Sequence, residues 1–391
     1  MIKKILLSIG LLLILAVAAL LVFAPTQVDR SMNKVVEHER YPISDRSQAF
    51  HNSLIVGDWH ADTLLWSRDL SLENDYGHAD IPRLQKGNVG LQMFTTVTKS
   101  PSGLNYQQNS ADSRDNITTL ALVQRWPVST WFSLTERALH QAQKLHTIAA
   151  KQKDDLFIIT SQQNLSEWKR LRENNKQLIG GLIGTEGSHA LDGKLENVDT
   201  LYQAGFRMMS LQHFFDNKLG ASLHGISQTG LTEFGRQVIK EMRSKNIILD
   251  VSHSSEQVVR EVLALNSGPV VISHTGFNGH CEAQRNISDN LMRGIAAQGG
   301  LIAVGYWENV LCGSTLSALA DALEYGISLV GEDHVSLGSD YDGSIDALFD
   351  TSELGALTHE LLERGLSEDQ VGKVMGGNML RFLEQNLPAT D

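Results

Sequence analysis

The sequence predicts an α/β fold: a (β/α)8 TIM barrel with a rim insertion, preceded by one N-terminal transmembrane helix. Two observations lead to this fold class. Eight short β-rich runs alternate with helical stretches from Ser53 onward, as in parallel βαβ units. Histidine or acidic side chains stand at the ends of most of these runs, and strand ends converge at the mouth of a barrel. A doubly wound open sheet is the structural alternative.

The first element is the apolar segment of residues 1–24. Lys3 and Lys4 precede an uncharged run that ends at Ala24, and about 20 apolar residues can cross a hydrocarbon core about 30 Å thick. We expect a membrane anchor with its basic end in the cytoplasm and the body on the periplasmic or extracellular side. A cleaved signal peptide is the alternative, and it also exports the body. Residues 25–52 are polar without a clean period and are interpreted as a linker.

The body, residues 53–391, is interpreted as one domain. Its β-rich runs are, in order, Leu54–Val56, Gly90–Val97, Leu178–Ile183, Phe206–Leu211, Ile247–Val251, Pro269–Ile272, Leu301–Val304 and Val335–Leu337. The long segment from Lys99 to Leu178 holds helical stretches and one further possible strand, Leu156–Ile159. We interpret this segment as an insertion on the barrel rim and not as a second domain.

Two of the predicted helices carry clear terminal signals. The stretch Thr232–Lys245 ends in basic residues, which favour a helix C-terminus. Ser367–Gln370 has the pattern of a capping box. Behind this box, apolar residues recur on one helical face up to Phe382, so a buried C-terminal helix is expected.

Composition excludes a nucleic-acid binder. The 391 residues include 33 basic and 45 acidic side chains, for a net charge of −12, whereas nucleic-acid binding needs a basic surface. The 42% of hydrophobic residues suffice for a full core. Cys281 and Cys312 are the only cysteines, and in an exported protein an even pair suggests one disulfide.

Five side chains at the ends of the β-rich runs predict a metal centre. His60 and Asp62 follow the first run, Glu186 the third, His253 the fifth and His274 the sixth. Each alone is more often an ordinary polar residue, but together they offer three imidazoles and two carboxylates at one barrel mouth. Such donors fit zinc first, with manganese, cobalt or iron as alternatives. One catalytic zinc uses three protein ligands, so five ligands suggest two ions bridged by Glu186.

The ordered motifs of the body resemble one known family. They are Asp58-x-His60-x-Asp62, Ile183-Gly184-x-Glu186-Gly187-x-His189, Gly230-Leu231-Thr232-x-Phe234-Gly235, Asp250-x-Ser252-His253-x-Ser255, Pro269-Val270-x-x-Ser273-His274, Arg285-Asn286-x-x-Asp289, Gly338-Ser339-Asp340-x-Asp342-Gly343 and Gly376-Gly377-Asn378. In this order and spacing they resemble the membrane dipeptidase (renal dipeptidase) family of amidohydrolase-type zinc metallopeptidases, from about Ser53 to Leu387.

The resemblance implies a binuclear zinc hydrolase that cleaves the peptide bond of dipeptides. His60 and Asp62 would bind one Zn2+ ion, His253 and His274 the second, and Glu186 would bridge the two. Two cations beside one water lower its pKa toward about 7, so a metal-bridging hydroxide would attack the peptide carbonyl. The resemblance also implies tolerance of a D-residue at the C-terminal position and a homodimer.

Further residues receive roles from the same resemblance. His213 would bind the substrate carbonyl oxygen and donate to the developing oxyanion, and Arg285 would hold the substrate carboxylate. Asp340 would take the proton of the attacking water and deliver it to the departing amine. Cys281 and Cys312 stand where members of the family place a disulfide.

Two other functions are left open at this point. The first is a related amidohydrolase that acts on another amide, a lactam or a lactone. The second is a non-catalytic, membrane-tethered binding protein on the same scaffold. The complete set of five ligands together with Asp340 argues against the second function, because a decayed site usually loses ligands.

Overall fold

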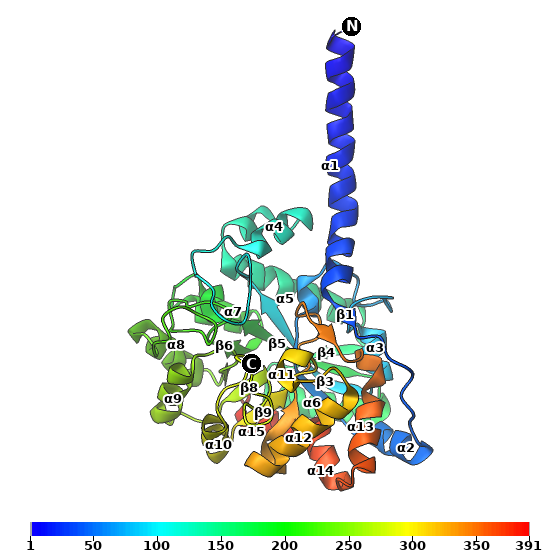
Figure 1. Ribbon diagram of the computed structural model, residues 1–391, viewed down its shortest axis with the longest axis vertical. Helices are drawn as coiled ribbons and strands as arrows, with labels where there is room; N and C mark the ends of the chain where they lie inside the picture. Colours follow the sequence, from blue (N-terminus) through cyan, green and yellow to red (C-terminus); the bar gives the residue numbers. More distant parts are fainter. Residues whose placement is uncertain (1, 391) are drawn as a thin grey trace.

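Eight parallel strands form a barrel in the computed structural model of the chain, which describes residues 2–390 (Figure 1). In sequence order they are β2 (Val56–Ala61), β3 (Val89–Val97), β5 (Ile179–Glu186), β6 (Phe206–Ser210), β7 (Ile248–Asp250), β8 (Val271–Thr275), β9 (Leu301–Val304) and β10 (Val335–Leu337). Each pairs with the next in parallel. The Asp62 amide donates to the Tyr341 carbonyl at 2.8 Å, which joins the last strand to the first. The (β/α)8 barrel is therefore confirmed over the open sheet.

Helices surround the barrel, and the ones with terminal signals form as expected. They include α3 (Ile81–Lys86), α6 (Gln162–Asn174), α7 (Asn197–Gln203), α8 (Glu233–Ser244), α9 (Glu256–Leu265), α10 (Asp289–Ala297), α11 (Glu308–Leu311), α12 (Leu316–Val330) and α13 (Leu354–Glu363). Short 3-10 turns are η1 (Thr63–Leu65), η2 (Val128–Trp131), η3 (Ser188–Leu191), η4 (Glu332–His334) and η5 (Thr351–Glu353). Helix α8 is capped by Thr232, whose hydroxyl accepts from the Gly235 amide at 3.0 Å.

The C-terminal helices cover the N-terminal ends of the strands. After the capping box of Ser367, α14 (Glu368–Gly372) passes through a π-helical turn (Lys373–Gly377) into α15 (Asn378–Asn386). A Cβ on Gly376 would lie 2.0 Å from the Ile55 carbonyl oxygen, so only glycine permits this approach to β2. The Asn378 amide donates to the Val335 carbonyl at 2.8 Å. The opposite end of the barrel stays open for a site.

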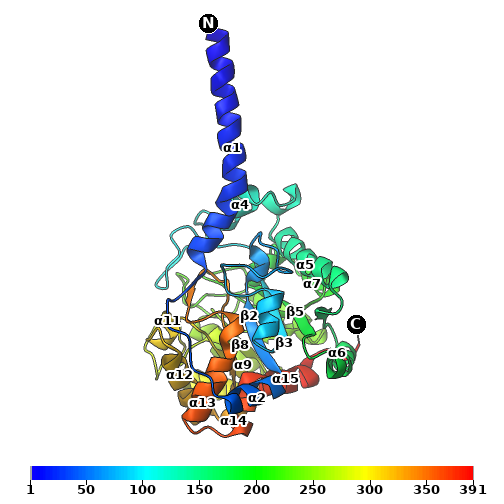
Figure 2. The ribbon, with the colours of Figure 1, turned by 90° about the vertical axis from the view of Figure 1, so that its right-hand side faces the viewer.

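The rim insertion forms between β3 and β5. It contains α4 (Asn116–Val123), α5 (Leu134–Lys151) and β4 (Leu156–Ile158), and β4 pairs in parallel with the first residues of β5. Helix α4 lies at the open end of the barrel beside the base of the N-terminal helix α1 (Ile2–Met32) (Figure 2).

The N-terminal part of the chain differs from the expectation. Among the described residues, no helix combines the length and apolar character needed to cross a membrane, so the predicted transmembrane helix is not supported. Helix α1 continues past Ala24 into the segment that we interpreted as a linker. That segment also holds β1 (Lys34–Val35), which pairs with β11 (Asp346–Ala347), and α2 (Asp45–Ser53). Buried Asp29 and Asn33 anchor the end of α1 to the body through Arg68 and Ser344.

Candidate metal centre and substrate pocket

The first two predicted ligands stand at the end of β2. His60 lies inside the strand, Asp62 follows it, and both side chains are buried. Asp58 accepts hydrogen bonds from the backbone amides of His60 at 2.8 Å and Ser339 at 3.2 Å, which fixes this end of the strand. Thr95 on β3 donates to Asp62 Oδ1 at 2.6 Å, and the same oxygen is 3.5 Å from His60 Nε2.

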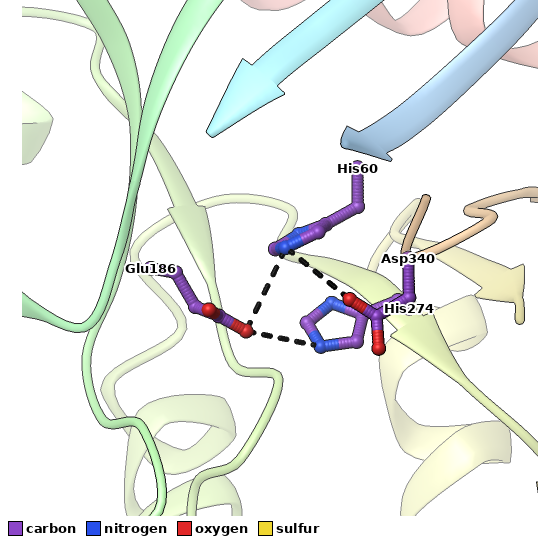
Figure 3. Close-up of side chains that lie close together, drawn as sticks. All are labelled: His60, Glu186, His274 and Asp340. Atoms are coloured by element: carbon purple, nitrogen blue, oxygen red, sulfur yellow. Dashed lines mark ion pairs between the residues drawn. The ribbon is translucent and has the colours of Figure 1, made fainter. Parts of the chain in front are cut away.

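Glu186, the last residue of β5, points toward His60 and His274 (Figure 3). Its Oε1 is 3.6 Å from His60 Nε2, 3.1 Å from His253 Nε2 and 3.4 Å from His274 Nε2. Its Oε2 is 3.2 Å from His213 Nε2. Two groups could each hold an ion, and Glu186 belongs to both: His60, Glu186, His274 and Asp340 form one, and Glu186, His213 and His253 the other.

This grouping differs from the pairing that the family resemblance implies. His274 stands with His60, whereas we expected it with His253. Asp62 belongs to neither group, although its Oδ1 is 3.5 Å from His60 Nε2. The three rings lie close together, because His253 Nε2 and His274 Nε2 are 2.9 Å apart and the His60 and His274 ring centroids are 3.8 Å apart. All five predicted ligands therefore converge on one small volume.

Ser273 sets the tautomer of two of the imidazoles. Its hydroxyl donates to Asp250 Oδ2 at 2.7 Å, so the Ser273 oxygen can only accept from the rings beside it. His60 Nδ1 lies 3.1 Å and His274 Nδ1 2.9 Å from this oxygen. Both rings therefore carry hydrogen on Nδ1 and present a lone pair at Nε2, which is the arrangement that a metal ligand needs.

The cluster fits zinc on its own chemistry. His60 Nε2 is buried and lacks a hydrogen-bond partner in the structure, although buried polar atoms are normally paired. Burial, together with the nearby Asp62 and Asp340 carboxylates, raises the pKa of Glu186 well above its usual value. Cations between these acids would relieve their repulsion. Imidazole nitrogens and carboxylate oxygens without thiolate match catalytic zinc.

Asp340 and His213 face the same cluster from the loops that follow β10 and β6. Asp340 Oδ1 is 3.9 Å from His60 Nε2, and burial raises the pKa of Asp340 to about 8 against the attraction of His60. Burial lowers the pKa of His213 to about 4, so its ring is neutral. The backbone is left-handed at His253 (φ 60°) and at Asp340 (φ 61°), and such conformations of non-glycine residues concentrate at functional sites.

Arg285 lies beside the cluster without an acidic partner. It is 2% exposed, and its Nη2 donates to the His274 carbonyl at 2.8 Å and lies 3.3 Å from His253 Nε2. Within residues 2–390, no carboxylate forms an ion pair with it. Since a buried cation normally has a partner, Arg285 has the free capacity to bind an incoming carboxylate.

The predicted disulfide between Cys281 and Cys312 is confirmed. Cys281 stands four residues before Arg285, and Cys312 follows α11 and Trp307. The Asn286 side chain donates to the Cys281 and Val310 carbonyls, each at 3.0 Å. The bond therefore ties the loop of Arg285 to the loop of Trp307, whose ring lies 6.0 Å from the guanidinium.

A pocket of about 660 Å³ opens above the cluster. Its floor contains Asp62, Glu186, His213, His253, Arg285 and Asp340. Its sides include residues that sequence reasoning missed, among them Tyr106 and Phe214, and helix α1 contributes to it as well. Tyr106 comes from the rim insertion, and its hydroxyl accepts from the Trp307 indole at 3.1 Å. No sequence signal distinguishes Tyr106, because it stands in a polar loop far from every motif.

Comparison with known proteins points to one family. The profile of the family described as membrane dipeptidase (peptidase family M19) matches residues 44–389. Human Dipeptidase 3 is 27% identical over 361 residues, which is 87% of this chain and 67% of that protein. Mouse Dipeptidase 3 is 28% identical, over 83% of this chain and 67% of that protein.

Solved structures share the fold. The probable dipeptidase PvdM from Pseudomonas aeruginosa superimposes with a TM-score of 0.69 at 18% identity, over 88% of this chain and 97% of its own. A metallopeptidase from Rhodobacter sphaeroides was solved with a phosphinate mimic of the dipeptide L-Ala-D-Ala. It superimposes with a TM-score of 0.67 at 22% identity, over 85% of this chain and 99% of its own.

Proposed function

This chain belongs to the membrane dipeptidase family, peptidase family M19, as a zinc-dependent dipeptidase, and on that premise we propose that it works with two zinc ions. The observation that carries the proposal is the position of Glu186, whose carboxylate belongs to two separate groups of metal-ligating side chains. In the assignment that the family resemblance implies, His60 and Asp62 would hold one ion, His253 and His274 would hold the other, and both would share Glu186. The side-chain groups in the structure are arranged differently, because His274 and Asp340 stand with His60 and Asp62 belongs to neither group.

The chemical roles of the bound metal and of Asp340 follow from the positions of the side chains. Bound zinc supplies an activated water and polarises the peptide carbonyl. Asp340 faces the cluster at the pocket floor, where its carboxylate can take a proton from the attacking water and pass it to the departing amine.

His213 serves as a neutral hydrogen-bond donor in this proposal. Its Nε2 lies 3.2 Å from Glu186 Oε2, and its Nδ1 lies 3.3 Å from the Lys99 carbonyl. Nε2 therefore faces the cluster, where a substrate carbonyl oxygen would lie. With a hydrogen on Nε2, the ring donates to this oxygen as its negative charge develops.

Arg285 sets the length of the substrate. A planar guanidinium suits a carboxylate, and Arg285 touches the His253 and His274 side of the cluster. When it binds the substrate carboxylate, the carbonyl one residue away lies over the cluster, so dipeptides fit and tripeptides do not. Because the arginine reads only the carboxylate, we propose that a D-residue is accepted at the C-terminal position. The L-Ala-D-Ala mimic in the structurally similar metallopeptidase supports this.

One paired experiment tests the dipeptidase proposal. The purified protein is analysed for metal and assayed with an Xaa-Xaa dipeptide, the same dipeptide as its C-terminal amide, and an N-acyl amino acid. We expect two zinc ions per chain and cleavage of the free dipeptide only. In Arg285→Ala, kcat/KM for the dipeptide should fall by the equivalent of about 2–5 kcal/mol, and Arg285→Lys should rescue it poorly. Equal cleavage of dipeptide and amide by the wild type would favour the broader amidohydrolase instead.

We further propose that the catalytic domain lies outside the cytoplasm. The Cys281–Cys312 bond supports this, because disulfides persist in oxidising compartments. The apolar run behind Lys3 and Lys4 supports export. Protease added to intact cells or spheroplasts should digest the body but spare a cytoplasmic control protein. Fractionation and mass spectrometry of the N-terminus then distinguish membrane attachment from cleavage and release.

The assembly proposal is a homodimer, which rests on the family resemblance. Light scattering on the purified protein should give twice the mass of one chain. A single-chain mass at the concentration used for the activity assay would contradict it.

A further inference from the structure

One wall of the substrate pocket comes from the N-terminal helix. The apolar side chains on this wall are Ala24, Pro25, Val28 and Met32 of α1, and Ile117, Leu120 and Val123 of α4 face the same pocket. The four α1 residues precede residue 44, where the match to the family begins. The wall is therefore built from a part of the chain outside the matched region.

Buried polar contacts hold this part of α1 in place. Arg68 Nη1 donates to both carboxylate oxygens of Asp29, at 2.8 and 2.9 Å, and the same guanidinium pairs with Asp342. Asn33 donates to Asp29 Oδ1 at 2.7 Å and accepts from the Ser344 amide at 3.0 Å. Asp29 is 1% exposed and Asn33 2%. Asp342 and Ser344 belong to the loop after β10 that also carries the proposed catalytic acid, so wall and loop are joined.

The Asp62 end of the pocket is apolar. Arg285 contacts His253 and His274, whereas Asp62 contacts His60 and leads into η1. There the apolar cluster of Leu65, Trp66, Val97, Ile117, Ala121 and Trp126 packs with Val28 of α1. The apolar wall thus adjoins the Asp62 end.

We propose that the α1 wall is a subsite for the first residue of the dipeptide and selects large apolar side chains. This inference rests on the proposed dipeptidase function. With the substrate carboxylate on Arg285 and the scissile carbonyl over the cluster, the N-terminal residue points to the Asp62 end. The pocket of about 660 Å³ falls in the range of about 300–1,000 Å³ of small-molecule sites, so it has room for a leucine or phenylalanine side chain. Leu-Ala should be cleaved with a kcat/KM at least about tenfold above that of Gly-Ala.

The test compares two dipeptides in two wall variants and one control variant. Val28→Thr and the double variant Val28→Thr with Met32→Gln make the wall polar without changing its size much. Val22→Thr is the matched control, because Val22 lies on the same helix, is 58% exposed and does not line the pocket. We expect the double variant to lose about tenfold in the Leu-Ala to Gly-Ala ratio of kcat/KM. The control and the Gly-Ala value should stay within about twofold.

A second readout does not depend on turnover. Calorimetry with non-cleavable phosphinate analogues of Leu-Ala and Gly-Ala should show the same loss of preference in the double variant. If the wild type cleaves both dipeptides but the ratio does not move in the double variant, the wall is not a subsite. If the wild type cleaves neither, the dipeptidase function itself is wrong and the subsite with it.

Discussion

At the scale of single residues, the metal centre depends on how each donor atom is presented. Glu186 is the only proposed ligand that belongs to both groups. We expect Glu186→Gln to weaken the binding of both ions, because it keeps the shape of the side chain but removes the shared charge. His253→Ala should remove one ion and nearly all activity. Elemental analysis of the purified variants measures both effects, and one ion or none in the active wild type would contradict the two-zinc proposal.

Ser273 provides a test of the tautomer argument. Without its hydroxyl, the Nδ1 hydrogens of His60 and His274 lose their acceptor. We expect Ser273→Ala to lower zinc affinity by about 10–100-fold. Competition with a chelator measures this change. Ser336→Ala is the matched control, since Ser336 is equally buried on β10 and its hydroxyl makes no hydrogen bond. Equal zinc affinity in the two variants would show that Ser273 does not orient the rings.

His51 predicts a pH dependence of stability that is independent of the metals. Burial lowers the pKa of His51 to about 4, and the ring is held by Thr358 at 2.8 Å and the Gly87 carbonyl at 3.1 Å. The unfolded chain binds this proton near pH 6.5 and the folded protein only near pH 4. The stability that the neutral His51 ring contributes is therefore complete above about pH 6.5, and it is lost as the pH falls toward 4.

Comparison with a variant isolates this contribution. Between pH 7 and pH 4.5, the free energy of unfolding of the wild type should fall by about 1–3 kcal/mol more than that of His51→Gln. Urea unfolding at each pH provides the measurement. Parallel pH profiles for the two proteins would rule out titration of His51 as the cause.

At the scale of elements, the disulfide determines how firmly two active-site loops are held. Replacing both cysteines by serine should cost about 2–4 kcal/mol of stability. It should also raise KM for dipeptides more than it lowers kcat, because Arg285 and Trp307 stand on the two joined loops. Thermal unfolding and steady-state kinetics measure the two effects. A stability loss with KM unchanged would show that the bond does not position Arg285.

Elements with a regular pattern could be predicted from the sequence, and the others could not. The buried strands were visible because parallel strands read as apolar runs. The predicted run ends at Val56, whereas β2 continues to Ala61. The difference arises because Asp58 and His60 interrupt the apolar pattern of this strand. The five ligands stood beside recognisable runs and motifs. Tyr106 and the α1 wall carry no local signal, because only tertiary contacts such as Asp29 to Arg68 bring them to the pocket.

At the scale of the whole molecule, the pocket depends on contacts between segments far apart in the sequence. Arg68 joins Asp29 of α1 to Asp342 in the loop that carries the proposed catalytic acid. Arg68→Met would leave two buried carboxylates without their cation, and removing one partner of a buried charge pair costs about 3–5 kcal/mol. We expect a lower melting temperature, and a lower kcat at temperatures where the variant stays folded. Calorimetry and kinetics at one temperature check this, and an unchanged kcat would show that the catalytic loop keeps its position without the link.

The docked N-terminal helix also has a consequence for how substrate preference could be changed. Residues 24–32 contribute a wall to the pocket but none of the proposed metal ligands. If the wall is the subsite proposed above, substitutions in this short segment would alter which dipeptides are preferred while the proposed catalytic centre stays intact. A new preference could then be engineered without rebuilding the barrel.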